Sequence, residues 1–403
     1  MRSCIFSLLL SLPLAAATLQ VGADKPYLTP CAALRAAASG DVIEIDAGLY
    51  KGDVCAFYAD NLTIRGVNGR PHIDADGKAA QGKGIWVPKG RNTVVENIEF
   101  SGATVVDQNG AGIRQDGVNL TVRNCYFHDN EDGILESNVA GSNIVIEFTE
   151  FARNGFGDGY SHNLYIGHAA SLVFRFNYSH DAIEGHLLKT RAGVNYILYN
   201  RLTEESGTGS YEANIPNGGT TYFIGNMIQQ GPSTHNGKIL SYLDEGRNAG
   251  NPGIDLYVIN NTFVNERGSG TFINIGSQGL VPAVVTNNIF FGSGTLTNQA
   301  SAVLTNNLTE DPLLADVANF DYHLTPHSPA INAGADPGLS LDEHVLTPLF
   351  QYAHPACGEE RATVQTIDIG AFEWAGRRSA PCVLDKGGRA ERAVDAPLLP
   401  VVP

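Results

Sequence analysis

Short stretches of β-forming residues recur along the chain, and each centres on a polar position that is usually asparagine. The stretches centre on Asn97, Asn124, Phe148, Asn177, Asn200, Asn226, Asn261, Asn288 and Asn307. They recur at intervals of roughly 20 to 35 residues, as solenoid repeats do. No segment carries a sustained helical stripe, so each repeat is expected to hold two or three short strands. The pattern predicts an all-β, single-stranded parallel β-helix.

Stacking explains why such repeats fold together. One coil alone has two open strand edges and cannot bury its apolar side chains. Stacked coils pair their backbones and share one core, and asparagines at equivalent positions can hydrogen-bond along the stack. We therefore interpret the recurring asparagines as a structural ladder, and the Asn61-Leu-Thr and Asn119-Leu-Thr motifs as by-products of it.

Composition divides the chain into five parts. The N-terminus, MRSCIFSLLLSLPLAAATLQ, reads as a secretory signal cut near Ala17. We expect a signal peptide at 1–17, a cap with the first coil at 18–60, β-helix coils at 61–310, C-terminal coils or a cap at 311–374, and a disordered tail at 375–403. The cap contains Leu28 to Asp41, where Thr29, Pro30 and Gly40 bound a short predicted helix. The protein is expected to be secreted or periplasmic.

Charge and cysteine content limit which binding partners and which disulfides we expect. The chain has a net charge of −16, which argues against nucleic acid as a partner. No later apolar run is long enough to span a bilayer, so no membrane association is expected, and we expect a monomer. An oxidising compartment permits disulfides. We predict the local pairs Cys31–Cys55 and Cys357–Cys382, with Cys125 buried as a free thiol.

From about Thr18 to Trp374, the chain resembles secreted right-handed parallel β-helix proteins of the pectate-lyase-like superfamily. The resemblance rests on the repeat and on the closing motifs SPAINAG (Ser328 to Gly334) and DIGAFE (Asp368 to Glu373). It implies a protein that binds or cleaves acidic polysaccharides, although the fold also hosts other activities. The stretch GHLLKTRA (Gly185 to Ala192) resembles, more weakly, the lysine-bearing coil of the alginate lyase and chondroitinase-B family. In that family a lysine acts as base and an arginine one coil later assists. Here the next coil, SYEANIPNG, has no arginine.

Six stretches are expected to lie one above another: GIRQD, GILES, HNLYIG, GHLLKT, GSYEAN and KILSYL. Neighbouring coils lie about 4.8 Å apart, so residues two coils apart lie within reach of one sugar and its neighbours. Predicted catalytic residues on these stretches and adjoining turns are Lys189, His162, Arg191, His186, Tyr165 and Tyr211. Predicted substrate-binding residues are Arg114, Glu136, Glu212, Asn214, Asn217, Tyr242 and Glu245.

These residue types suit β-elimination of a uronic-acid polymer. The reaction needs a cation against the substrate carboxylate, a base for the proton beside it, and an acid for the leaving oxygen. Arg191 or Arg114 suits the first task, and Lys189, followed by His162, suits the second. A tyrosine, Tyr165 or Tyr211, suits the third.

Plainer interpretations stay open for each residue. Lys189 can be a surface lysine, the histidines structural, and Arg191 an ion-pair partner of Glu184 or Glu212. A glycoside hydrolase would need two carboxylates on one groove wall, and a non-catalytic carbohydrate-binding protein would need neither. Glu136, Glu212 and Glu245 could hold Ca²⁺ through their oxygens, but no calcium-type loop is present and the metal stays unassigned.

Overall fold

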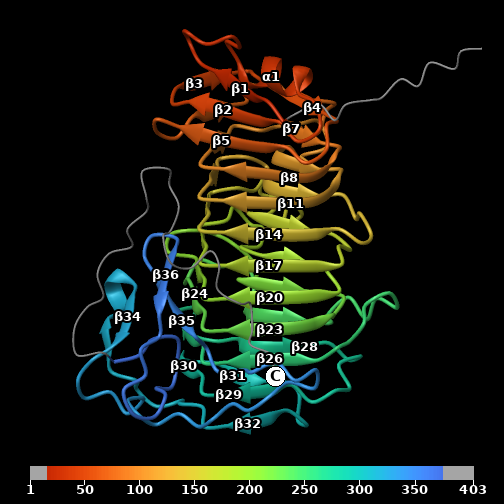
Figure 1. The fold of residues 1–403 in the computed structure, drawn as a ribbon. Helices are drawn as coiled ribbons and strands as arrows, with labels where there is room; N and C mark the ends of the chain where they lie inside the picture. Colours follow the sequence, from red (N-terminus) through yellow and green to blue (C-terminus); the bar gives the residue numbers. More distant parts are fainter. Residues whose placement is uncertain (1–15, 375–403) are drawn as a thin grey trace, which may run out of the picture.

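Three long parallel sheets, which we call sheets A, B and C, run through the computed structural model (Figure 1). The structure describes residues 16–374. Each coil passes from sheet C to sheet A to sheet B, and every pairing in the three sheets is parallel. This confirms the predicted all-β parallel β-helix. Most of the predicted signal peptide and the whole predicted tail lie outside the described residues.

Sheet A has twelve strands in the order of the chain. They are β1 (Thr18–Val21), β2 (Val42–Asp46), β5 (Thr63–Val67), β8 (Arg91–Glu96), β11 (Val118–Arg123), β14 (Asn143–Glu147), β17 (Ser171–Arg175), β20 (Val194–Leu198), β23 (Thr220–Ile224), β26 (Leu256–Ile259), β29 (Val284–Thr286) and β32 (Val303–Thr305).

Sheets B and C have ten strands each. Sheet B contains β3 (Leu49–Lys51), β6 (His72–Asp74), β9 (Glu99–Ser101), β12 (Tyr126–His128), β15 (Glu150–Ala152), β18 (Tyr178–His180), β21 (Arg201–Thr203), β24 (Met227–Gln230), β27 (Thr262–Asn265) and β30 (Ile289–Gly292). Sheet C contains β4 (Cys55–Phe57), β7 (Gly84–Pro88), β10 (Ala111–Gln115), β13 (Asp132–Glu136), β16 (Leu164–Ile166), β19 (Lys189–Thr190), β22 (Ala213–Ile215), β25 (Lys238–Tyr242), β28 (Thr271–Ile275) and β31 (Thr295–Thr297).

The N-terminal end is closed by a helix, α1 (Pro30–Ala36). Pro30 opens the helix as predicted, but Thr29 makes no side-chain capping bond, and the helix ends at Ala36, before Gly40. The next residue, Ala37, is already extended. The predicted Cys31–Cys55 disulfide is present and ties the helix to β4. Cys125 is free and buried, as predicted, whereas Cys382 lies outside the described residues.

The asparagine ladder is present, but it occupies two columns rather than one. In the inner column each side-chain oxygen accepts a hydrogen bond from the backbone N–H one coil earlier. Its members are Asn177, Asn200, Asn226, Asn261, Asn288 and Asn307. Asn97, Asn124 and Phe148 lie one residue earlier in their coils, at positive φ angles of 57°, 50° and 52°. The single predicted column was therefore wrong at these three positions.

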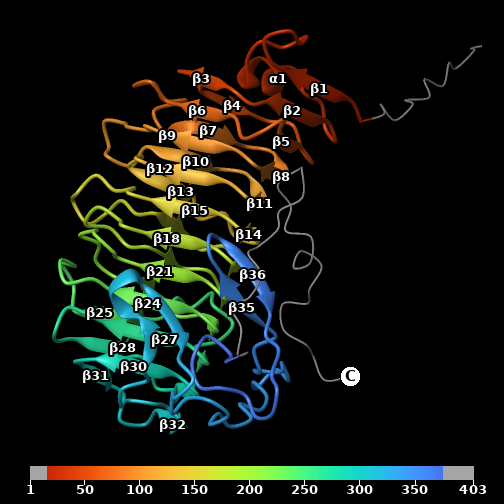
Figure 2. The same ribbon diagram turned by 90° about the vertical axis from the view of Figure 1, so that its left-hand side faces the viewer.

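Beyond β32 the chain leaves the coils and returns along their side (Figures 1 and 2). It forms β33 (Leu314–Asp316), a short 3-10 helix η1 (Val317–Asn319), β34 (Asp321–Leu324), β35 (Phe350–Ala353) and β36 (Cys357–Glu360). The strands pair antiparallel, β33 with β34 and β35 with β36. Leu346 and Phe350 of this segment pack on an aromatic stripe that includes Phe176, Tyr199 and Tyr222.

No helix in residues 16–374 has the length and hydrophobicity that crossing a membrane requires.

Candidate functional site

The six stretches expected to stack are six consecutive strands of sheet C, from β10 to β25. Their register places Tyr165, Lys189 and Asn214 at paired positions on β16, β19 and β22. The residues directly before them, Leu164, Leu188 and Ala213, are buried in the core, so alternation turns the paired side chains outward. The predicted column of functional groups therefore exists on three successive coils.

Two cations meet on the ring of Tyr165. Lys189 Nζ lies 5.2 Å and the Arg191 guanidinium carbon 5.8 Å from its centroid. Arg191 Nε donates a hydrogen bond of 2.8 Å to the Tyr165 hydroxyl, and Nη1 donates to the side-chain oxygen of Asn217. These bonds fix the guanidinium in one orientation beside Lys189.

A carboxylate from a later turn joins these cations. Glu245 lies 2.7 Å from Arg191 Nη2 and 3.7 Å from Lys189 Nζ. The side chain of Glu245 is 47% exposed, whereas those of Lys189 and Arg191 are 12% and 15% exposed. We call Tyr165, Lys189, Arg191, Asn217 and Glu245 the basic cluster. The ion-pair partner of Arg191 is therefore Glu245, and not Glu184 or Glu212, which were considered from the sequence.

Asp244 belongs to the same surface, and sequence reasoning missed it. It accepts hydrogen bonds of 3.1 and 3.4 Å from the Asn214 amide, at its two carboxylate oxygens. Its charge also helps to raise the pKa of Tyr211, for which burial is the larger cause. Its place beside Glu245 in the stretch Leu243 to Gly246 was the available signal.

A stack of rings lies under the basic cluster. The His162 and His186 rings stack at 4.3 Å, and Tyr211 packs edge-on against His186 at 4.8 Å. His162 is fully buried, and its Nδ1 accepts the backbone N–H of His186 at 3.0 Å. The hydrogen of a neutral His162 therefore resides on Nε2, which has no hydrogen-bond partner among the described residues. In this arrangement His162 has no free lone pair to offer a substrate.

Burial and like charges shift the titration of this group. Burial, reinforced by Arg191, lowers the pKa of Lys189, although Glu245 and Asp244 oppose the shift. Burial, with His186 and the two cations, lowers the pKa of His162 well below its usual value. Burial and the charge of Lys189 likewise lower the pKa of His186 well below its usual value. Both histidines are therefore neutral near pH 7. Burial and the nearby charge of Arg191 make the protonated form of Lys189 less favourable than it is in water.

Besides the rings beneath it and Asn214, four of the predicted residues lie outside the basic cluster. Arg114 lies three strands away and contacts Ser137 and Asp116. Glu136, Glu212 and Tyr242 are buried, at 2%, 0% and 1% exposure. The carboxylate of Glu136 accepts backbone N–H groups, including that of Gly167, and the Tyr242 hydroxyl donates to the Gly219 carbonyl. Glu212 accepts a hydrogen bond of 3.2 Å from Gln230 Nε2, so all three side chains have structural contacts inside the coils.

The glutamates considered for Ca²⁺ do not converge. Among the described residues, no three-carboxylate group includes Glu136, Glu212 and Glu245 within ligand distance of one another. A cavity of about 200 Å³ lies elsewhere, on sheet A, and is lined by Gln20, Lys25, Glu44, Asp46, Val67 and Asn68.

Comparison with known proteins agrees with this architecture. The family model described as the right handed beta helix region matches residues 47–228. The crystal structure of pectate lyase Pel9A superimposes with a TM-score of 0.59 over 90% of this chain and 97% of that chain. The two sequences are 15% identical, so the similarity concerns the fold. No curated protein sequence matches the chain. The matched family model and the stacked coils together identify the chain as a right-handed parallel β-helix protein, and its fold is similar to that of pectate lyase Pel9A.

Proposed function

We propose that the protein is a secreted polysaccharide lyase that cleaves a uronic-acid polymer by β-elimination. One observation carries the proposal. Lys189 and Arg191 share an outward site in which, among residues 16–374, the only carboxylate contacting both is the half-exposed Glu245. A substrate carboxylate that replaced Glu245 would meet an oriented guanidinium and an amine together. The similarity to pectate lyase Pel9A supports the same class of reaction.

Arg191 is suited to neutralise the substrate carboxylate. Its Nε and Nη1 are held by Tyr165 and Asn217, so Nη2 is the group directed at the carboxylate position. A guanidinium fixed in this way is preorganised for negative charge, which grows on the carboxylate as the adjacent proton leaves.

Lys189 is suited to take that proton. Its amine must be neutral to act as base, and burial lowers its pKa in that direction. The Lys189 lone pair accepts the proton from the carbon beside the carboxyl group. The electrons of the C–H bond form a carbon–carbon double bond, and the glycosidic C–O bond breaks with its electron pair on oxygen. His162 is not assigned this role, because its Nδ1 is occupied and its ring is buried.

The leaving oxygen needs a proton from a neighbouring acid. Burial and Asp244 raise the pKa of Tyr211, so its hydroxyl keeps its proton at neutral pH. Tyr165 is the second candidate, since its hydroxyl accepts from Arg191 and still carries a hydrogen to donate.

The test uses purified protein with alginate, polygalacturonate, glucuronan and glycosaminoglycans. A lyase produces unsaturated uronates, which absorb ultraviolet light; a hydrolase produces reducing ends without that absorbance; a binding protein produces neither. We expect ultraviolet-absorbing product, lost in Lys189→Ala. Lys238→Ala is the matched control, because Lys238 lies two strands away in sheet C and is also partly exposed. Full activity of folded Lys189→Ala would contradict the assignment.

A further inference from the structure

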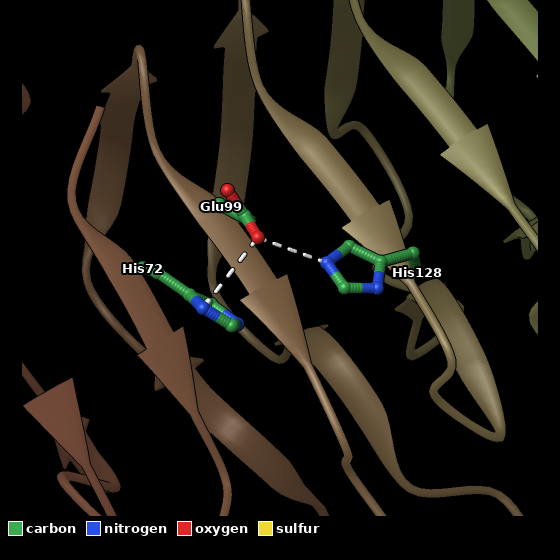
Figure 3. A group of neighbouring side chains, drawn as sticks. All are labelled: His72, Glu99 and His128. Carbon is green, nitrogen blue, oxygen red and sulfur yellow. Dashed lines mark hydrogen bonds and ion pairs between the residues drawn. The ribbon is translucent and has the colours of Figure 1, made fainter. Parts of the chain in front are cut away.

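Two histidines and a glutamate converge on sheet B, a different face from the basic cluster. His72, Glu99 and His128 project from β6, β9 and β12, three neighbouring strands, and Glu99 lies between the two rings (Figure 3). Glu99 Oε1 is 3.0 Å from His128 Nε2 and 3.5 Å from His72 Nδ1. One ligand atom from each residue lies within 4.8 Å of the other two. No role in the proposed lyase reaction involves these residues.

These distances suit a shared metal ion. Zinc bonds of about 2.0–2.1 Å in tetrahedral geometry place ligand atoms about 3.3 Å apart. The side chains are 28%, 26% and 14% exposed for His72, Glu99 and His128. Water can therefore reach the position that three protein ligands leave open.

The outer nitrogen of each ring is also engaged. His72 Nε2 lies 2.7 Å from the Ser101 hydroxyl, and His128 Nδ1 lies 2.6 Å from Asp129 Oδ2. If these outer nitrogens carry the hydrogens, the lone pairs of His72 Nδ1 and His128 Nε2 both face Glu99. Metal-binding histidines in proteins have this second contact to a hydroxyl or carboxylate as a rule.

Asp129 is itself held in place as an acceptor. Arg153 donates to both of its oxygens, at 3.0 and 2.8 Å. These two bonds fix the carboxylate that faces His128 Nδ1.

We propose that His72, Glu99 and His128 form a binding site for a divalent transition metal of the zinc class. Two imidazole nitrogens and one carboxylate oxygen are the donors that zinc takes in three-ligand sites. The bound ion would join three successive coils near the N-terminal end of the β-helix.

The chain contains its own comparison two coils further on. His180 lies 3.3 Å from Glu150 through Nε2 and 2.8 Å from Asp181 through Nδ1, as His128 lies against Glu99 and Asp129. In this second group Tyr126 pairs with Glu150, as His72 pairs with Glu99 in the first group, so a tyrosine stands where the first group has His72. The second group thus lacks one imidazole, and it serves as a matched control for an ionic network without metal.

The experiment uses tag-free full-length protein stripped with EDTA and titrated with Zn²⁺ against a chromophoric chelator. We expect one zinc per chain, and a rise in the unfolding temperature when zinc is added. His72→Ala and His128→Ala should lose this binding, while His180→Ala should retain it. Asp129→Asn should weaken it about 10–100-fold, as loss of an outer contact does. Co²⁺ in place of zinc should give the visible bands of a four-coordinate ion, absent in His72→Ala.

Two results would overturn the site. One is stripped wild-type protein that takes up no zinc, which would leave His128 as a hydrogen-bond partner of Glu99 and Asp129. The other is equal zinc binding by His72→Ala, His128→Ala and His180→Ala. Should the alanine variants fail to fold, as judged by circular dichroism, Glu99→Gln preserves the side-chain shape and tests the same ligand set.

Discussion

Glu245 Oε2 lies 2.7 Å from Arg191 Nη2, although the two residues lie on different coils. A carboxylate of the protein thus occupies the position proposed for the substrate carboxylate. We predict that Glu245→Gln lowers KM for an acidic polymer. The partly exposed ion pair is worth about 1 kcal/mol at most, so the change should be roughly fivefold or less. Steady-state kinetics at low salt would measure it.

A control separates this competition from a general loss of negative charge. Glu184 is 37% exposed and pairs with His235 at 3.8 Å, outside the basic cluster. Glu184→Gln should leave KM nearly unchanged, because it removes one surface charge that does not contact the basic cluster. A Glu245→Gln variant with unchanged or higher KM would contradict displacement of Glu245 by substrate.

The pH dependence of the reaction should report Lys189. Burial and Arg191 lower its pKa from the ordinary value of 10.5. The amine is active when neutral, so kcat/KM should rise with pH and level off with a midpoint below 10.5. Arg191→Gln removes one lowering charge and should move that midpoint upward while also reducing the rate. A rate that falls with increasing pH across this limb would exclude Lys189 as base.

Glu204 should make the folded protein less stable as pH rises. It is fully buried, neither carboxyl oxygen has a hydrogen-bond partner in the described part of the chain, and burial followed by Asp181 raises its pKa well above 4.5. The folded state retains a proton that the unfolded chain loses, so the free energy of unfolding falls as pH rises above about 4.5. Glu204→Gln should therefore be more stable than wild type at pH 7, by about 1 kcal/mol or more.

Urea unfolding at pH 4 and pH 7 would measure this difference. The two proteins should be nearly equal at pH 4, where the wild-type carboxyl is protonated in both states. A Glu204→Gln variant that is less stable at pH 7 would mean that the carboxylate is ionised and stabilised in the folded protein.

The inner asparagine ladder should contribute more stability than its exposed counterpart. Asn226 is fully buried, donates to the Ile197 carbonyl and to Asn261, and accepts from Asn200. Asn226→Ala leaves buried partners without hydrogen bonds and should cost about 3 kcal/mol or more. Asn92 bonds to Asn61 and Asn119 on the surface, where water can replace it. Asn92→Ala should cost under about 1 kcal/mol in the same chemical denaturation experiment.

The asparagines also show where sequence reasoning reaches its limit. The left-handed corner and the ladder position beside it both favour asparagine, for different reasons. The pairs Asn260-Asn261 and Asn287-Asn288 fill both positions, as the φ angles of 51° and 57° at the first residues show. Where only one asparagine is present, as at Asn124, the pattern cannot tell which position it fills, and the prediction slipped by one residue.

The candidate site was predictable as far as strand stacking determines it. Tyr165, Lys189 and Asn214 lie on consecutive coils, so a correct alignment of coils places them together. Arg191, two residues beyond Lys189, followed from the same alignment. Glu245 was also expected beside this groove, but its ion pair with Arg191 and the presence of Asp244 were not predicted, because the path of this turn depends on a loop without a repeat.

The returning segment limits how the chain can be shortened. Leu346 and Phe350 pack on the stripe of stacked rings that includes Phe176, Tyr199 and Tyr222, and the Leu349 backbone donates to the Tyr199 hydroxyl. A protein ending after β32 would keep every parallel strand pair yet expose these rings to water. Such a truncated β-helix would be prone to self-association, so the modular repeat does not make the last coils dispensable.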